Sequence, residues 1–197
     1  MATKIPYAQL EQIPGWFRRM DMEMFRLLLD ATEERLGGGD LAELGVYLGK
    51  SAALMGFSLR PGESFTVVDL FSAEAPTADN QSENDEQYAE LSREAFEGYY
   101  RQFHEELPVV VQAPSQTIVD HAAHGTHRFV HIDASHLYEH VVGDIEAARA
   151  TAAGRGGGLR RLPHGPRPGR RGRGLARDHE GPHPVRGDAQ QALRDVR

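Results

Sequence analysis

The stretch Asp40-Leu-Ala-Glu-Leu-Gly-Val-Tyr-Leu-Gly-Lys-Ser51 decides how this chain folds. Its first half is an apolar run typical of a short buried strand, and Gly45 and Gly49 predict a turn. Ser51 predicts a capped helix start. A strand that enters a helix through such a turn presents backbone N–H groups and the positive end of a helix dipole to a ligand. An ordinary strand–turn–helix has the same pattern, so the rest of the chain has to decide between the two interpretations.

Helical and strand patterns alternate along the first 153 residues. Apolar residues at helical spacing predict a helix over 14–36, which Gly37-Gly-Gly39 ends. After the opening stretch, further strands are expected at 65–71, 108–112 and 128–133, helices at about 50–59, 88–103, 115–123 and 137–152, and a polar loop at 72–87. This order predicts an α/β fold with a doubly wound, mostly parallel sheet.

Polar side chains stand where the predicted strands end. Glu43, Asp69, Ser115 and Asp133 all fall at or just beyond the carboxyl end of a strand. Ligands of doubly wound sheets bind at that edge. The sequence therefore predicts a ligand site built from these four positions.

Two phosphate-binding motifs can be set aside. Gly49-Lys50-Ser51 matches the last three residues of a phosphate loop. That motif also needs a glycine five positions before Gly49, where this chain has Leu44. In the dinucleotide fingerprint, a glycine stands where this chain has Tyr47. A ligand without a pyrophosphate fits this turn better.

A third motif, His136-Leu-Tyr-Glu139-His140, matches the H-x-x-E-H pattern of one class of zinc peptidases. A zinc site of that class needs a further carboxylate downstream, and few acids follow Glu146. A zinc hydrolase is therefore the less favoured alternative.

Composition narrows the functional classes further. The chain has no cysteine, which excludes disulfides and thiolate metal sites, and no apolar run long enough for a membrane span, so a cytoplasmic protein is expected. Residues 1–150 carry 11 Lys and Arg against 25 Asp and Glu, whereas residues 151–197 carry 11 Arg against 4 acids. The acidic body makes nucleic acid an unlikely partner, although the basic tail offers a nucleic-acid-binding alternative.

Residues 1–150 resemble a bacterial class I S-adenosylmethionine-dependent methyltransferase, of the small O-methyltransferase branch that modifies natural products and sugars. Three stretches carry the resemblance: Glu43–Ser51, Val67–Phe71 and, most specifically, Phe129–Val141. The resemblance implies a Rossmann-like domain over 40–153 that binds S-adenosyl-L-methionine, preceded by a helical lid or packing segment over 1–39.

The resemblance also implies a role for each strand end. Asp69 would accept from the ribose hydroxyls and Ser115 would lie near the adenine. The methionine part would lie against the glycine turn, whose expected binding residues are Glu43, Gly45, Tyr47, Gly49 and Ser51.

The reacting groups are expected after the fourth strand. By resemblance to metal-assisted relatives, Asp133 would ligate Mg²⁺ and His136 would act as the general base toward a hydroxyl of a small-molecule acceptor. A homo-oligomer is compatible with the sequence. A binding-only protein of the same fold is the principal alternative to an enzyme.

The tail departs from the family pattern, which continues with further strands. Residues 151–197 contain 10 Gly, 5 Pro and 11 Arg without apolar periodicity, a composition typical of disorder. We interpret Gly158–Arg197 as an out-of-frame translation. Read from the second base of the Gly158 codon, GC-rich codons permit a strand ending in paired acids, an alanine-rich helix and an alternating strand.

The gene itself tests this interpretation. We expect sequencing across the codons for residues 150–160 to reveal an added or lost base, and the reframed protein to be more soluble and more active than the present chain. An intact frame, or full activity with the present tail, would refute the interpretation.

Overall fold

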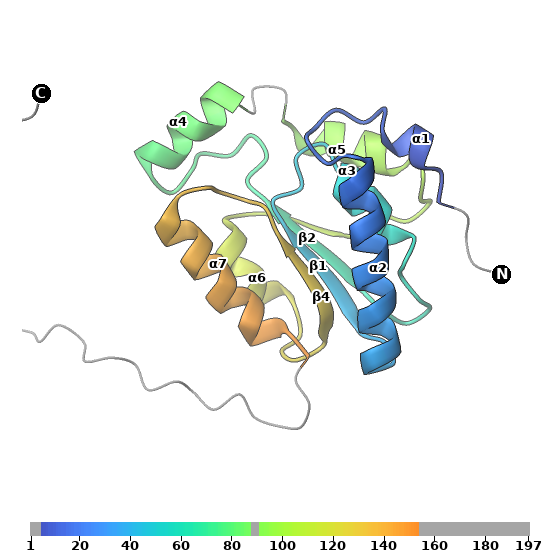
Figure 1. The fold of residues 1–197 in the computed structure, drawn as a ribbon. Coiled ribbons are helices and arrows are strands. Elements are labelled where there is room, and N and C mark those ends of the chain that lie inside the picture. Colours follow the sequence, from blue (N-terminus) through green and yellow to red (C-terminus); the bar gives the residue numbers. More distant parts are fainter. Residues whose placement is uncertain (1–4, 88–90, 154–197) are drawn as a thin grey trace, which may run out of the picture. The chain divides into compact units, whose positions relative to one another are not determined.

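The computed structural model describes residues 5–87 and 91–153, with the backbone alone for 83–87, and all of them belong to one compact unit (Figure 1). Its elements, in chain order, are α1 (Tyr7–Leu10), α2 (Arg19–Leu36), β1 (Asp40–Leu44), α3 (Lys50–Gly56), β2 (Phe65–Asp69), α4 (Ala78–Gln87), α5 (Arg93–Tyr100), β3 (Val109–Gln112), the 3₁₀ turn η1 (Ser115–Thr117), α6 (Ile118–His121), β4 (His127–Ile132) and α7 (Tyr138–Thr151).

The described residues form a four-stranded sheet in the order β3-β2-β1-β4, and every pair of neighbours is parallel. The register places Leu41 of β1 beside Phe65 of β2, and Leu44 beside Ile132 of β4. All five residues of β2 are buried, as expected of a strand covered on both faces. The predicted doubly wound α/β fold is confirmed.

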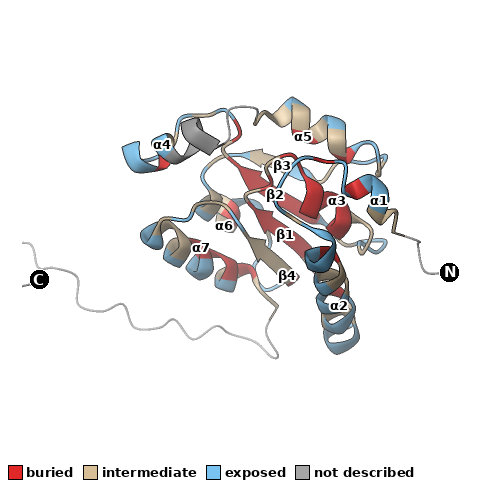
Figure 2. Cartoon of the chain, turned by 45° about the horizontal axis from the view of Figure 1, so that its top comes forward, coloured by how far each residue is buried: buried red, intermediate tan, exposed pale blue. Residues whose placement is uncertain are grey.

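Helices cover both faces of this sheet (Figure 1). Helices α1, α2, α3 and α5 pack on one face, where Leu41, Phe65 and Val67 meet core residues of these helices. Helices α6 and α7 pack on the other face, against Ala42 and Leu44. Figure 2 shows the buried strands β1 and β2 between these two layers. Successive residues of a strand thus pack into two separate hydrophobic cores, one on each face of the sheet.

Two segments differ from the sequence predictions. Helix α2 begins at Arg19 rather than at residue 14, because Gly15 lies at φ +129° and the Asp21 carboxylate accepts from the Arg18 N–H at the helix start (2.8 Å). The expected polar loop over 72–87 is wrong, because Ala78–Gln87 forms α4. Its sequence, Ala-Asp-Asn-Gln-Ser-Glu-Asn-Asp-Glu-Gln, lacks the apolar periodicity by which helices are predicted.

The chain returns to the sheet after α7. Ala152 forms a parallel bridge with His127, and the Ala153 N–H donates to the His127 carbonyl (2.7 Å). The predictions for residues 154–197, including the out-of-frame interpretation, lie outside the described residues.

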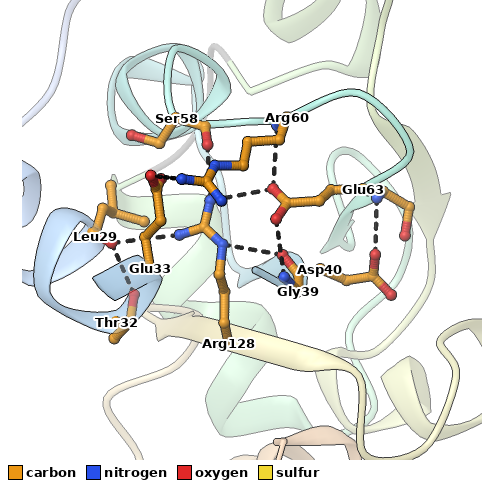
Figure 3. A network of polar contacts seen from close by, with 10 residues as sticks. Leu29, Thr32, Glu33, Gly39, Asp40, Ser58, Arg60, Glu63 and Arg128 are labelled. Atoms are coloured by element: carbon orange, nitrogen blue, oxygen red, sulfur yellow. Dashed lines mark hydrogen bonds and ion pairs between the residues drawn. The ribbon is translucent and has the colours of Figure 1, made fainter. Parts of the chain in front are cut away.

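Arg128 of β4 organises the sheet edge opposite the carboxyl ends of the strands. Its side chain is fully buried and donates to the carbonyls of Gly39 (3.0 Å), Leu29 (3.4 Å) and Ser58 (2.7 Å) (Figure 3). It also pairs with the Glu63 carboxylate at 3.2 Å. Burial opposes ionisation of Glu63, but hydrogen bonds from the Gly39 N–H and from Arg128 outweigh it and lower its pKa. One guanidinium therefore joins α2, β1, the end of α3 and the start of β2.

We expect Arg128→Met to lower the free energy of unfolding by about 3 kcal/mol, because it removes the buried guanidinium that pairs with the Glu63 carboxylate and donates to three carbonyls. Denaturant unfolding measures the change. Arg26→Met is the control: it removes two exposed ion pairs of α2, with Glu23 and Asp30, and should change the free energy by less than about 0.5 kcal/mol. Equal effects of the two variants would contradict the role assigned to Arg128.

Candidate active site

A cavity of about 700 Å³ opens at the carboxyl edge of the sheet. The segment before α2 and the segments that follow all four strands contribute to its wall. Its predicted lining residues are Gly45, Tyr47, Ser51, Asp69, Ser115, Asp133 and His136, and they are joined by Gly15, Trp16, Phe17, Lys50, Gln116, Glu139 and His140, among others. The structure thus brings seven of the nine predicted site residues to one cavity.

Asp69, at the end of β2, fixes the two loops beside it. One carboxylate oxygen accepts the N–H groups of Val46 (2.7 Å) and Tyr47 (3.2 Å), and the other accepts that of Phe71 (2.7 Å). Tyr47 and Phe71 are the two non-glycine residues with positive φ among those described, at 49° and 50°. Burial raises the pKa of Asp69, and the three backbone bonds oppose this shift. Asp69 therefore supports two strained backbone positions while it faces the cavity.

Gly45 lies where the turn after β1 meets the segment after β4. A side chain at this position would collide with the Asp133 carbonyl oxygen and would come within 2.5 Å of the Ala134 Cα. Its φ of +80° also favours glycine. The two loops are therefore in direct backbone contact, and Gly45 sets how closely the β4 loop approaches.

Glu43 does not line the cavity, although the sequence predicted that it binds the ligand. It is fully buried, and one of its oxygens accepts from the Ser51 hydroxyl and bonds the His131 imidazole (2.7 Å). Burial opposes protonation of His131, but the hydrogen bond and charge of Glu43, and the charge of Asp133, raise its pKa. Glu43 acts through Ser51, which sits inside α3 and does not cap it, because Gly49 is the N-cap.

Gly49 also lies outside the cavity wall. At φ +83° it packs against Phe96, whose ring would be 2.7 Å from a Cβ at this position. The N–H of Gly49 donates to the Val46 carbonyl and that of Gly45 to the Val68 carbonyl, each at 2.8 Å. These two N–H groups therefore stabilise the turn itself, and the presentation of other N–H groups at the start of α3 to a ligand stays a prediction.

Ser115 is held from behind by α7. Its hydroxyl donates to Asp144 (2.6 Å), a fully buried carboxylate whose second oxygen has no partner among the described residues. Burial raises the pKa of Asp144, although the Ser115 bond and the nearby His140 oppose the shift. Gly143 leaves room for the Gln116 side chain, because a Cβ at position 143 would collide with the terminal amide of Gln116. The sequence does not identify Asp144 as a site residue, because it lies within a predicted helix and not at a strand end.

The segment after β4 brings Asp133, His136, Glu139 and His140 to the cavity wall. Within the described ranges, however, no three His, Asp or Glu side chains are grouped closely enough to hold a metal ion. The H-x-x-E-H motif therefore does not form a zinc site with any third described ligand. The magnesium prediction rests on Asp133 alone.

The segment before α2 closes part of the cavity. The Trp16 ring lies 5.5 Å from that of Tyr47, and the Lys50 ammonium donates to the Gly15 carbonyl (3.0 Å). In the sequence, Lys50 is marked only by the phosphate-loop pattern, and no local pattern predicts its contact with the Gly15 carbonyl.

Comparison with known families decides the identity of this fold. A methyltransferase domain family matches residues 42–158, which is more than half of the chain. The chain belongs to this methyltransferase family.

One solved structure agrees at the level of the fold. The O-methyltransferase NovP matches with a TM-score of 0.52 and 19% identity over 67% of this chain and 61% of NovP, so the chain spans less than two thirds of that enzyme. A weaker match is the TDP-rhamnose 3′-O-methyltransferase CalS11 of calicheamicin biosynthesis, with a TM-score of 0.41 and 17% identity over 77% of this chain and 68% of CalS11. Curated protein sequences give no match. None of the described helices combines the length and the apolar composition needed to cross a bilayer.

Gly45→Ala should destabilise the methyltransferase fold more than Gly62→Ala does. Both glycines have similar positive φ angles, of 80° and 88°, but a Cβ at Gly62 meets nothing within 4 Å. Gly62→Ala should cost about 1 kcal/mol of backbone strain, and Gly45→Ala at least about 2 kcal/mol because of the added collision with the β4 loop. Chemical unfolding of both variants gives the difference, and equal losses would contradict the close approach of the two loops.

Proposed function

We propose that this chain is an S-adenosylmethionine-dependent methyltransferase that methylates a hydroxyl group of a small molecule. The observation that carries the proposal is the convergence of Asp69, Ser115 and Asp133 from three strand ends on one cavity. Ligands of doubly wound sheets bind at this edge, and the cavity volume lies within the range of small-molecule sites.

The residues present fit the methyl donor. The methionine part would bind beside the turn after β1, whose Gly45, Val46 and Tyr47 line the cavity. Asp69 lines the cavity, and its three backbone bonds leave about one of its four lone-pair sites to accept from a ribose hydroxyl. Ser115 and Gln116, supported by α7, would face the adenine.

The donor, when bound, supplies a methyl group on a positively charged sulfur. His136 lines the same wall as Asp133 and would hold the acceptor hydroxyl and receive its proton on an imidazole nitrogen. Transfer would form a bond between the hydroxyl oxygen and the methyl carbon, and the electron pair of the broken carbon–sulfur bond would stay on the sulfur. Positioning of the two reactants in one cavity supplies much of the rate enhancement.

Magnesium has no step in this scheme. Asp133 is a suitable ligand for a hard cation, but the described residues offer no group of three ligating side chains with it. A magnesium-assisted reaction, a cytoplasmic location and a homo-oligomer stay predictions from the sequence.

Calorimetry with S-adenosylhomocysteine tests the donor site, and transfer of a labelled methyl group to a panel of sugars and phenols tests catalysis. We expect the chain to bind the product, and His136→Gln to lower turnover by roughly 10²–10⁴-fold while binding is retained. Binding without turnover on any acceptor would favour the binding-only alternative. Absence of binding would contradict the donor assignment.

A further inference from the structure

Lys50 is a buried cation on the wall of the cavity. Only 9% of its surface is exposed, and its ammonium donates to the Gly15 carbonyl. It forms no ion pair with any described carboxylate. Burial, together with the nearby Arg18, lowers its pKa, whereas Glu11 opposes the shift. An ammonium has three N–H donors, and the Gly15 carbonyl takes one of them.

Three other donors near this wall are already engaged. Asp69 accepts the N–H groups of Val46 and Tyr47. The Ser51 hydroxyl donates to the buried Glu43, so that toward the cavity its oxygen can act only as an acceptor. The Lys50 ammonium is therefore the charged donor that this part of the wall offers to an anionic ligand group that enters beside α3.

The charges on the cavity wall also favour Lys50 as the site for an anionic group. Asp69, Asp133 and Glu139 are acidic, and Lys50 is the only lysine or arginine among the described lining residues. A carboxylate would be repelled by the acidic part of the wall and attracted to Lys50. Partial burial strengthens this attraction, because water screens it less.

We propose that Lys50 bridges the Gly15 carbonyl and the carboxylate of an amino-acid-bearing ligand, so that binding of this ligand fastens residues 13–18 over the cavity. The inference rests on the proposed function, because S-adenosylmethionine and S-adenosylhomocysteine both carry such a carboxylate. In this proposal, the lysine of the Gly49-Lys50-Ser51 motif binds a carboxylate and not a phosphate.

The bridge couples the cavity to the segment that carries Trp16. Gly15 and Trp16 are neighbours in sequence, and Trp16 lies against Tyr47 of the turn that precedes Lys50. Trp16 is the only tryptophan of the chain, so its fluorescence reports on residues 13–18 without interference. Its indole is 63% exposed, which makes it sensitive to closure over the cavity.

The test compares S-adenosylhomocysteine with 5′-methylthioadenosine, which has the same nucleoside and sulfur but no amino-acid part. On the full-length chain, calorimetry should show tighter binding of S-adenosylhomocysteine. Lys50→Met should weaken that binding roughly ten- to one-hundredfold, as loss of a charge-assisted hydrogen bond does, and leave the affinity for 5′-methylthioadenosine within about twofold. The change in Trp16 fluorescence with S-adenosylhomocysteine should be lost in the same variant.

Two further variants separate charge from structure. Lys50→Gln can still donate to the Gly15 carbonyl but has no charge, so it should keep the Trp16 emission of the free wild type and lose affinity for S-adenosylhomocysteine. Arg35→Met removes an exposed cation at the end of α2 and should change neither ligand's binding.

Equal weakening of both ligands by Lys50→Met, or unchanged binding of S-adenosylhomocysteine, would overturn the bridge while the donor site stands. Failure of the wild type to bind either ligand would overturn the proposed function and the bridge with it. Circular dichroism of each variant shows whether the fold is retained.

Discussion

The carboxylate of Asp69 is the constraint on which the cavity depends. It accepts three backbone N–H groups from the loops after β1 and β2, and two of these belong to residues with positive φ. Without those bonds, the backbone at Tyr47 and Phe71 would relax toward ordinary conformations. The turn after β1 would then change its approach to the β4 loop, which Gly45 now contacts directly. One side chain thus organises the walls contributed by three strands.

The two edges of the sheet have different tasks. At the amino edge, the buried Arg128 joins α2, β1, α3 and β2 through three carbonyls and one carboxylate. At the carboxyl edge, buried polar groups such as Asp69 and Asp144 hold loops that surround a cavity. The amino edge and the cavity edge are therefore held by separate polar networks, with the apolar core between them.

Much of this arrangement follows from sequence patterns, and the exceptions have physical causes. Apolar runs predicted the strands, and strand ends predicted Asp69, Ser115 and Asp133 as lining residues. Helix α4 was missed because its residues are polar all round. Glu43 was misplaced because a strand end does not reveal which face a side chain takes, and in the fold it points to Ser51 and His131. No local pattern predicts the Ser115–Asp144 hydrogen bond, whose residues are 29 positions apart, or the Lys50–Gly15 hydrogen bond, whose residues are 35 positions apart.

The backbone contact between Gly45 and the β4 loop also limits how this scaffold can be redesigned. Loops that run over the surface of a protein vary in sequence and tolerate insertions and deletions. Here Asp133 and Ala134 lie against the turn that precedes α3, so a transplanted loop has to preserve their backbone path. The residues from Ser135 onward do not take part in this contact with Gly45. Grafts that begin there should retain the turn beneath them, whereas grafts that begin at Asp133 require a matching turn after β1.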